Sequence, residues 1–363
     1  MAMMTTGRAP VPLVPLDARA VGMSVARTNF MRRPASEPAR VGHREWLHFS
    51  IGGPDLTLLV NMSVVDDQRP SVPRGCERGR VLVLVRDSGG WGGGADEVGA
   101  AELEVHGGRV FVALAESSVD LVAGVFVVKV RLRDRPIAFE LELRPRAFPS
   151  MASNVAIGPG EEPINWVVVP DLSADGWLEI AGARRQIRGA PAYHDHNWGY
   201  FSHRDFAWQW GHALPDDGAS PFSAVFARLL NGAQTETYMQ SRRLWRDGRQ
   251  YRVFREDEVE VSAEGLLRKD DFFTVPRTAR LLTGGTAADI PKRLRIEAKG
   301  RGDAVSACFE AIDAARIAVP NEHDLGTTLI HEVVGVFELR GVVRGEPVAL
   351  GGHAVFEYLG RGA

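Results

Sequence analysis

The sequence predicts an all-β protein built from two barrel- or sandwich-like halves. Short valine-rich or alternating apolar runs recur along the chain, and turn residues separate them about every 8–12 residues, as in sandwiches and barrels. No segment before residue 180 has a helical period. The length of 363 residues suits two cores, because a single core stops growing at about 250–300 residues. We expect a flexible leader at residues 1–20, an N-terminal domain at 21–190 and a C-terminal domain at 191–363.

The N-terminal half reads as a series of strands and hairpins. Two strand pairs are predicted around Gly107-Gly108 and around residues 133–136, because such turn residues connect antiparallel strands. The glycine-rich residues 88–94 predict a flexible loop. This loop lacks the lysine of a phosphate-binding loop, which argues against a nucleotide site. The other strands are predicted at residues 45–51, 56–65, 80–86, 165–169 and 176–180.

The C-terminal half continues in the same style. One hairpin is predicted around residues 215–218 and another around residues 245–248, where Asp247-Gly248 favours a primed turn. The remaining strands are predicted at residues 258–261, 293–298, 304–311, 327–339 and 353–359.

Composition excludes several classes of partner. The chain has 43 basic and 46 acidic residues, a net charge of −3, so it has no footprint for nucleic acid. No apolar run approaches the ~20 residues that span a bilayer, so we expect no stable membrane insertion. The N-terminus lacks the features of a signal peptide. Cys76 and Cys308 lie far apart and favour a reduced, cytoplasmic setting, with a single disulfide as the alternative.

The densest group of proton-handling side chains lies at residues 192–200. On an extended strand side chains alternate between faces. His194 and His196 would then share one face, and Tyr193, Asp195 and Asn197 the other. We expect Asp195 to act as an acid or base in a mostly apolar pocket, because such surroundings raise the pKa of a carboxyl group. Tyr193 and His196 would assist it.

Two other interpretations of this group remain open. His194 and His196 could ligate a metal, with His203 and His212 as the nearest candidates for a third ligand. Alternatively, Asp195 and the histidines form a satisfied hydrogen-bond network with a purely structural role.

Aromatic and acidic residues elsewhere have a similar ambiguity. One strand face is predicted to carry an aromatic stripe, which fits either a core or a pocket wall. Glu45 lies beside His48 in an early strand, and as a buried acid it either pairs with an arginine or serves the site. His331-Glu332 begins like a zinc-protease motif but lacks the second histidine and a helix, so we assign no metal to it. The stripe consists of Phe206, Trp208, Trp210 and His212.

Four segments resemble the carotenoid 1,2-hydratase (hydroxyneurosporene synthase, CrtC/AttH-like) superfamily, which includes lipocalin-like Diels–Alderases and cyclases. Its Tyr-x-Asp-x-Asn-x-Gly pattern is matched at residues 193–199. Trp166 matches the tryptophan of an upstream His-x-Trp pair, with Ile164 at the histidine position. Residues 45–49 resemble an early Glu-Trp-Trp-Tyr-Phe strand, and residues 351–358 a closing strand.

The resemblance implies two lipocalin-like domains, a site at or between them, no cofactor, and an aspartate that protonates a carbon–carbon double bond. We therefore expect a cofactor-independent cyclase or isomerase. Its substrate would be an apolar, unsaturated terpenoid or polyketide intermediate of secondary metabolism. The enzyme would either protonate a double bond of this substrate or direct its cyclisation by holding it in a folded shape. The alternatives are a hydratase acting on a carotenoid or terpenoid and a non-catalytic lipocalin-type carrier.

The expected site contains no metal and takes an apolar small molecule. Its catalytic residues are Asp195, Tyr193, His196 and His194, and its substrate-binding residues are Trp166, Asn197, Trp198, Trp208, Trp210, His212, Trp46 and Glu45.

Overall fold

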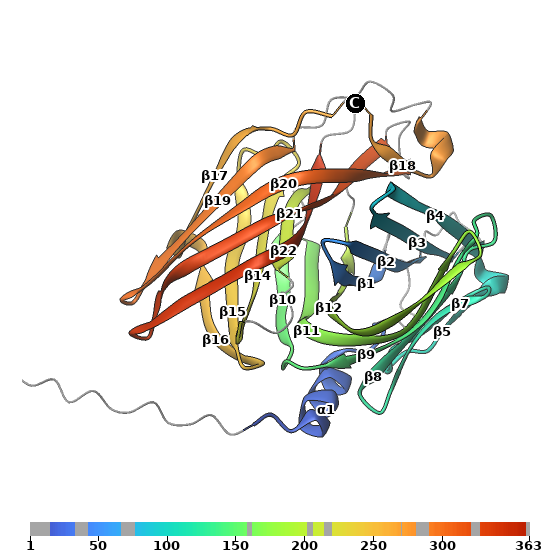
Figure 1. Cartoon of the computed structure of the whole chain (residues 1–363), viewed down its shortest axis with the longest axis horizontal. Helices are drawn as coiled ribbons and strands as arrows, with labels where there is room; N and C mark the ends of the chain where they lie inside the picture. Colours follow the sequence, from blue (N-terminus) through green and yellow to red (C-terminus); the bar gives the residue numbers. More distant parts are fainter. Residues whose placement is uncertain are drawn as a thin grey trace, which may run out of the picture.

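The chain folds into two large, curved and mostly antiparallel sheets, one of which is nearly closed into a barrel (Figure 1). Strands make up 75% of the structure, which confirms the predicted all-β, lipocalin-like class. No helix among the described residues is long and apolar enough to cross a membrane. The computed structural model describes residues 15–32, 43–66, 77–157, 162–201, 206–213, 220–269, 271–280, 290–320 and 327–360.

The first sheet has 12 strands in the order β4-β3-β2-β1-β12-β11-β9-β8-β7-β6-β5, with β10 also paired to β11. Consecutive strands are mostly neighbours, although β4 and β5 lie at opposite ends of the order. β12 pairs with β11 and also with β1, and so joins the two ends of this half of the chain. Its strands are β1 (His43–Gly53), β2 (Leu56–Asp66), β3 (Arg78–Asp87), β4 (Gly90–Gly99), β5 (Leu103–Val105), β6 (Phe111–Leu114), β7 (Ser117–Val122), β8 (Val125–Arg131), β9 (Ile137–Pro145), β10 (Ser150–Ile157), β11 (Glu162–Ile180) and β12 (Ala183–Tyr200).

The second sheet has 10 strands in the order β16-β15-β14-β13-β22-β21-β20-β19-β17, with β18 paired to β20. Here the last strand, β22, pairs with the first, β13, as β12 pairs with β1 in the first sheet. Its strands are β13 (Phe206–Ala213), β14 (Phe222–Asn231), β15 (Thr237–Arg246), β16 (Arg249–Arg255), β17 (Val259–Leu266), β18 (Phe273–Val275), β19 (Pro291–Gly300), β20 (Asp303–Pro320), β21 (Thr327–Val343) and β22 (Glu346–Gly360).

The predicted hairpins are present. β5 pairs with β6, β8 with β9, β13 with β14 and β15 with β16, and the last pair turns at Asp247-Gly248 as expected. The residues expected to form the turn between β13 and β14, 215–218, lie outside the described residues, as do His203 and Cys76. The alternative disulfide of Cys76 with Cys308 therefore stays a prediction.

Two local predictions were wrong. Residues 88–94 are not a flexible loop, because β4 begins at Gly90 and pairs with β3 along its length. At Gly93, which has a φ of +145°, a Cβ would lie 2.2 Å from the carbonyl oxygen of Val83, so glycine is required by the close approach of the two strands. The glycines therefore mark a tight strand pair and not a loop.

A helix, α1 (Ala18–Thr28), was also missed by the sequence analysis. Asp17 caps it by accepting a hydrogen bond from the backbone N–H of Arg19. Only Val21, Gly22 and Val25 are buried, so its apolar period is too weak to stand out in the sequence. The helix begins within the predicted leader, continues into the predicted N-terminal domain, and lies against the first sheet near β9 (Figure 1).

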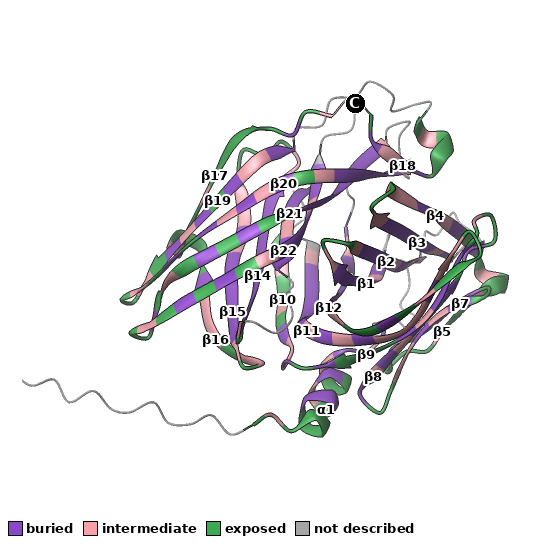
Figure 2. Ribbon diagram, in the orientation of Figure 1, coloured by how far each residue is buried: buried purple, intermediate pink, exposed green. Residues whose placement is uncertain are grey.

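Three apolar cores stabilise the fold: one inside each sheet and a third between the two sheets. The third includes Trp166 and Tyr193 from the first sheet with Trp208 and Val334 from the second. Figure 2 shows β1 and β14 as largely buried strands, with exposed residues at the hairpin ends. The predicted domain boundary at 190/191 falls inside β12, whose pairing places all of Ala183–Tyr200 in the first sheet.

Candidate functional site

The site begins with β12, the strand that carries the polar cluster. It lies between β1 and β11, and its register places Asn197 beside Trp46 and Trp166, and Asp195 beside His48. Residues paired across strands point to the same face of a sheet. Asp195 and Asn197 therefore face the second sheet, together with the side chains of their cross-strand neighbours.

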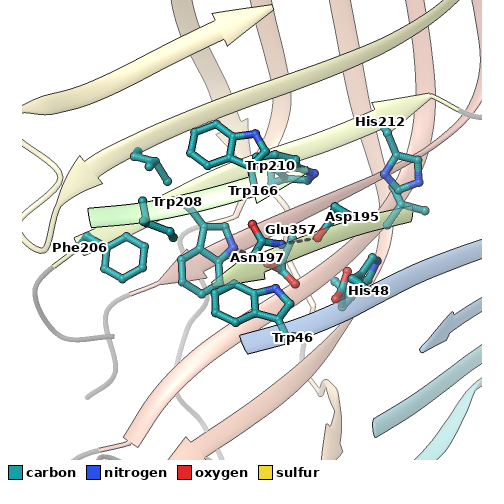
Figure 3. A pocket seen from close by; sticks show the side chains of 14 residues that line it. Trp46, His48, Trp166, Asp195, Asn197, Phe206, Trp208, Trp210, His212 and Glu357 are labelled. Atoms are coloured by element: carbon teal, nitrogen blue, oxygen red, sulfur yellow. Dashed lines mark hydrogen bonds between the residues drawn. The ribbon is translucent and has the colours of Figure 1, made fainter. Parts of the chain in front are cut away.

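The second sheet presents a matching row. Trp210 of β13 is opposite Glu357 of β22, which is opposite Glu332 of β21. Figure 3 shows that labelled side chains of both sheets converge: Trp46, His48 and Asp195 come from the first sheet, and Glu357, Trp208 and Trp210 from the second. The site is thus built by both halves of the chain.

Two adjoining cavities lie at this junction. The smaller has a volume of about 40 Å³ and is lined by Asp195, Asn197 and aromatic residues. The larger has a volume of about 410 Å³ and extends between β1–β4 and β20–β21. Its walls are partly apolar, with Val64, Leu82 and Ile317, and partly polar, with Arg44 and Arg80. Four residues line both cavities, Trp46, Trp208, Glu332 and Glu357.

Asp195 is 4% exposed and lies on the wall of the small cavity. Its carboxyl group accepts hydrogen bonds from the Asn197 amide and the Tyr193 hydroxyl. Burial raises the pKa of Asp195 from 3.8 to about 8, the nearby Glu357 adds to the rise, and the hydrogen bonds oppose it. The group is therefore mostly a neutral carboxylic acid at neutral pH.

Tyr193 and its neighbours fix the position of this acid. The Tyr193 hydroxyl accepts a hydrogen bond of 2.7 Å from Trp210 Nε1, and the His212 ring stacks on the Tyr193 ring at a centroid distance of 3.8 Å. Burial, with Asp195 nearby, raises the pKa of Tyr193 well above its usual value, so its O–H remains a donor to Asp195. Tyr193 lines neither cavity, and it acts on the site through Asp195.

Glu332 and Glu357 form a buried carboxyl pair across β21 and β22. They stand directly opposite each other and share a hydrogen bond. Burial raises the pKa of Glu332 well above its usual value, and the charge of Glu357 adds to the effect. Because two like charges at this spacing repel each other, the pair retains one proton. Burial also raises the pKa of Glu357, but the hydrogen bonds from Glu332 and from Trp208 Nε1–H oppose this rise, which makes Glu357 the better-stabilised carboxylate of the two.

Several polar atoms around the small cavity have no partner among the described residues. They are Glu332 Oε2, His212 Nε2 and Trp166 Nε1, on side chains that are 2%, 3% and 1% exposed respectively. Buried polar groups are ordinarily hydrogen-bonded, to protein or to water. A cavity of about 40 Å³ has room for more than one water, since one needs roughly 10–15 Å³. These atoms therefore mark a place where water or a ligand binds.

On the opposite face of β12, the polar side chains have hydrogen-bond partners. His194 accepts from Asn29 Nδ2 at 2.8 Å and donates to the carbonyl oxygen of His48 at 2.9 Å. The two ring nitrogens of His196 are hydrogen-bonded to Asn29 Oδ1 and to Glu45 Oε1, both at 2.7 Å. Both rings are fully enclosed, and all four of their nitrogens have partners. This group is a satisfied network inside the first sheet.

The predicted site residues therefore divide into two sets. His194 and His196 were assigned to the catalytic group, but strand alternation turns them away from Asp195 and from both cavities. Trp198 also lies on that side, against His196 and the Arg32 guanidinium. Glu45 lines the larger cavity, although its carboxylate is bound by His196 and the Arg32 N–H. The predicted residues that line the small cavity are Asp195, Asn197, Trp46, Trp166, Trp208, Trp210 and His212.

Three ionisable residues of the junction were missing from the expected site: His48, Glu332 and Glu357. Each had a local signal, since each is an ionisable residue within an apolar strand. Glu332 was set aside with the incomplete zinc-protease motif, and Glu357 lay unassigned in the closing segment. What identifies them is their non-local pairing, which brings residues 332 and 357 together opposite Asp195.

One set of metal-type ligands occurs among the described residues. Ligand atoms of His48, Glu332 and Glu357 lie within 4.8 Å of one another. The set does not fit a metal well, because Glu357 already accepts from Trp208 and is bonded through a proton to Glu332. The alternative pair, His194 and His196, has no free nitrogen to offer. We assign no metal to either group.

Comparisons with known proteins bear on the fold. No protein-family model matches the chain, and no curated protein is similar to it in sequence. Among solved structures, an AttH-type protein of Nitrosomonas europaea matches with a TM-score of 0.62 and 15% identity, covering 91% of this chain and 98% of that one. Kievitone hydratase from Nectria haematococca matches with a TM-score of 0.56 and 12% identity, covering 90% and 91%.

A third structure, CghA with Sch210972, matches with a TM-score of 0.55 and 14% identity, covering 89% of each chain. The similarity extends over almost the whole chain, so the two sheets and their arrangement are common to all three. The chain therefore has the fold of AttH-type proteins, kievitone hydratase and CghA, as the resemblance at residues 193–199 predicted.

Proposed function

We propose that the protein is an enzyme that protonates a carbon–carbon double bond of an apolar, unsaturated small molecule, with Asp195 as the general acid. The observation that carries this proposal is a buried, neutral carboxyl group on the wall of an aromatic cavity that adjoins a larger one. A proton donor must hold its proton at the working pH, and the raised pKa of Asp195, about 8, meets this condition.

The larger cavity supports a substrate of moderate size. Its volume of about 410 Å³ falls within the ~300–1,000 Å³ of small-molecule sites. The apolar walls would hold a terpenoid or polyketide body, and Arg44 and Arg80 would contact a polar end. The reacting double bond would lie at the junction between Trp46 and Trp208. Aromatic faces there would stabilise a developing carbocation.

The outcome that we propose first is cyclisation or isomerisation. An enclosed aromatic site holds a flexible chain folded and excludes bulk water from the cation. Two observations support this proposal: the superfamily that residues 193–199 resemble includes lipocalin-like Diels–Alderases and cyclases, and CghA, whose structure contains Sch210972, has the same architecture. Asp195 would give its proton to one alkene carbon, and the cation would close on a second double bond or lose a proton elsewhere.

Hydration is the second candidate. The specific observation in its favour is the small cavity with its unpartnered polar atoms, where a water molecule would lie close to the cation. Kievitone hydratase, whose name states this reaction, has the same fold. In this reaction water would trap the cation in place of a second double bond.

The test compares metabolite masses in the native host with and without Asp195→Asn. An accumulating precursor with the mass of the lost product indicates an isomerase or cyclase. A precursor lighter by one water indicates a hydratase. No change in any metabolite would contradict the enzyme proposal and favour a carrier. Glu338→Gln is the control, because Glu338 is an exposed acid on β21, away from the site.

A further inference from the structure

The proposed reaction needs a second proton-handling group, which the sequence analysis did not identify. An isomerisation or cyclisation that starts with protonation ends with loss of a proton from another carbon. Asp195 is an unsuitable acceptor for a proton on the far side of the substrate, because it lines only the small cavity. A base must face the larger cavity as well.

Glu332 and Glu357 are the acidic residues that line both cavities. Their strands place them at the same junction as Trp46 and Trp208. Glu357 accepts hydrogen bonds from Trp208 Nε1 and from Glu332, which together stabilise its charged form. A carboxylate held by two donors at a cavity wall is positioned to accept a proton.

A second observation shows that this pair faces a ligand. Glu332 Oε2 is buried and has no partner among the described residues, and His212 Nε2 and Trp166 Nε1 are in the same state across the small cavity. The cavity has room for water between them and Asp195. Such a water would connect the carboxyl pair with Asp195.

We propose that Glu357 is the catalytic base of the reaction, that Glu332 positions it, and that the small cavity holds the water through which the proton returns to Asp195. This inference rests on the proposed function. Asp195 transfers its proton to one alkene carbon, and the π electrons form the new C–H bond, which leaves a cation. Glu357 then removes a proton from a carbon next to the cation, and the electrons of that C–H bond form the new double bond.

The cycle balances without a further reactant. After the reaction the Glu332–Glu357 pair holds two protons and Asp195 is a carboxylate. One proton passes through the water of the small cavity to Asp195 and restores the starting state. Neither water nor an oxidant is consumed, as a reaction between isomers requires. The negative charge on Glu357 also stabilises the cation during the reaction.

The experiment uses an extract of the Asp195→Asn host, which contains the accumulated precursor, as the substrate for purified full-length proteins. Glu357→Gln should convert the precursor at least about 10²-fold more slowly than the wild type, the usual contribution of a general base. Glu332→Gln should also be slow. Glu338→Gln should match the wild type, because this acid lies further along the same strand as Glu332, where the strand is exposed and away from both cavities.

The pH profile separates a base from a merely structural residue. In the wild type the rate should fall at low pH, where the pair takes up its second proton, and again above pH 8. Glu332→Gln should shift the acidic limb and leave the alkaline limb in place. A structural defect would lower the rate at every pH without moving either limb, and that result would overturn the proposal.

An infrared measurement tests the shared proton without any substrate. The wild-type minus Glu332→Gln difference spectrum at neutral pH should contain the carbonyl stretch of a protonated carboxyl group. If this band is absent, Glu332 and Glu357 do not share a proton and the proposal is overturned. Wild-type turnover by Glu357→Gln, or one equivalent of metal in the purified protein, would overturn the proposal as well. If the Asp195→Asn host accumulates no precursor, the proposed function itself is wrong, and this outcome is distinct from a failure of the carboxyl pair alone.

Discussion

The two faces of β12 carry equally buried polar residues but differ in how their hydrogen bonds are satisfied. On the face toward the interior of the first sheet, His194 and His196 have a partner for every ring nitrogen. On the face toward the second sheet, Asp195 lies beside a cavity and beside polar atoms that have no partner among the described residues. The first arrangement stabilises the fold. The second leaves polar groups beside a cavity that can bind and react with a ligand.

This difference shows why residue type alone misleads. Histidines are frequent acids, bases and metal ligands, yet here they hold helix α1 and β1 to β12 through Asn29 and Glu45. On the other face of β12, Asp195 lies on the wall of a cavity opposite Glu332 of the second sheet, and both carboxyl groups have raised pKa values. Free hydrogen-bonding capacity next to a cavity is therefore the better guide to function.

The largest expected effect is that of Asp195→Asn on turnover. Loss of the general acid should slow conversion of the precursor by about 10²- to 10⁴-fold. Stability at neutral pH should rise by up to a few kcal/mol, because Asp195 must take up a proton when the protein folds and an amide need not. Rate measurements and urea unfolding of the same preparation check both statements. A variant that unfolds together with its activity would show that Asp195 is structural.

His196→Ala should have the opposite pattern. It removes one partner of the buried pair with Glu45, and such changes cost about 3–5 kcal/mol in the free energy of unfolding. Below its denaturation temperature the variant should retain turnover, because His196 faces neither cavity. Unchanged stability combined with lost turnover would return His196 to the catalytic group.

The stability of the protein should depend on pH through Asp195. Its pKa is 3.8 when unfolded and about 8 when folded, so between these values the folded protein binds the additional proton. The free energy of unfolding should therefore decrease as pH rises from about 4 to about 8, by a few kcal/mol, at about 1.4 kcal/mol per pKa unit. Urea titrations at several pH values should give a smaller decrease for Asp195→Asn. Equal slopes in both proteins would contradict the raised pKa.

Tyr193→Phe should have the smallest effect. The Tyr193 hydroxyl donates to Asp195 and lowers the pKa of that carboxyl, so its removal should raise the pKa further. The alkaline limb of the rate profile should move to higher pH. Stability should fall by about 1 kcal/mol, because the Trp210 N–H loses its acceptor. A limb that moves to lower pH would show that Tyr193 does not donate to Asp195.

Much of the fold followed from local patterns, and only part of the site did. The alternation of side chains along a strand correctly separated Asp195 and Asn197 from His194 and His196. The Asp247-Gly248 turn was also placed correctly. Both predictions depend only on residues that are adjacent in sequence. Helix α1 was missed because it buries few residues. Glu332 and Glu357 were missed because their significance lies in a cross-strand pairing and in the packing of one sheet on the other.

The glycine of the 193–199 pattern shows how a motif can include a packing requirement. A Cβ on Gly199 would lie 2.4 Å from the carbonyl oxygen of Pro163, so β11 and β12 can approach only with glycine there. Tyr193, Asp195 and Asn197 form one hydrogen-bonded group, and Gly199 allows the strand that carries them to pack.

The central claim is that Asp195 is a neutral acid facing the cavities, and infrared titration tests it most directly. The wild-type minus Asp195→Asn difference spectrum would be recorded at a series of pH values. We expect the carbonyl stretch of a protonated carboxyl group at pH 6, replaced by carboxylate bands with a midpoint at about pH 8. A difference spectrum with only carboxylate bands at pH 6 would contradict the account.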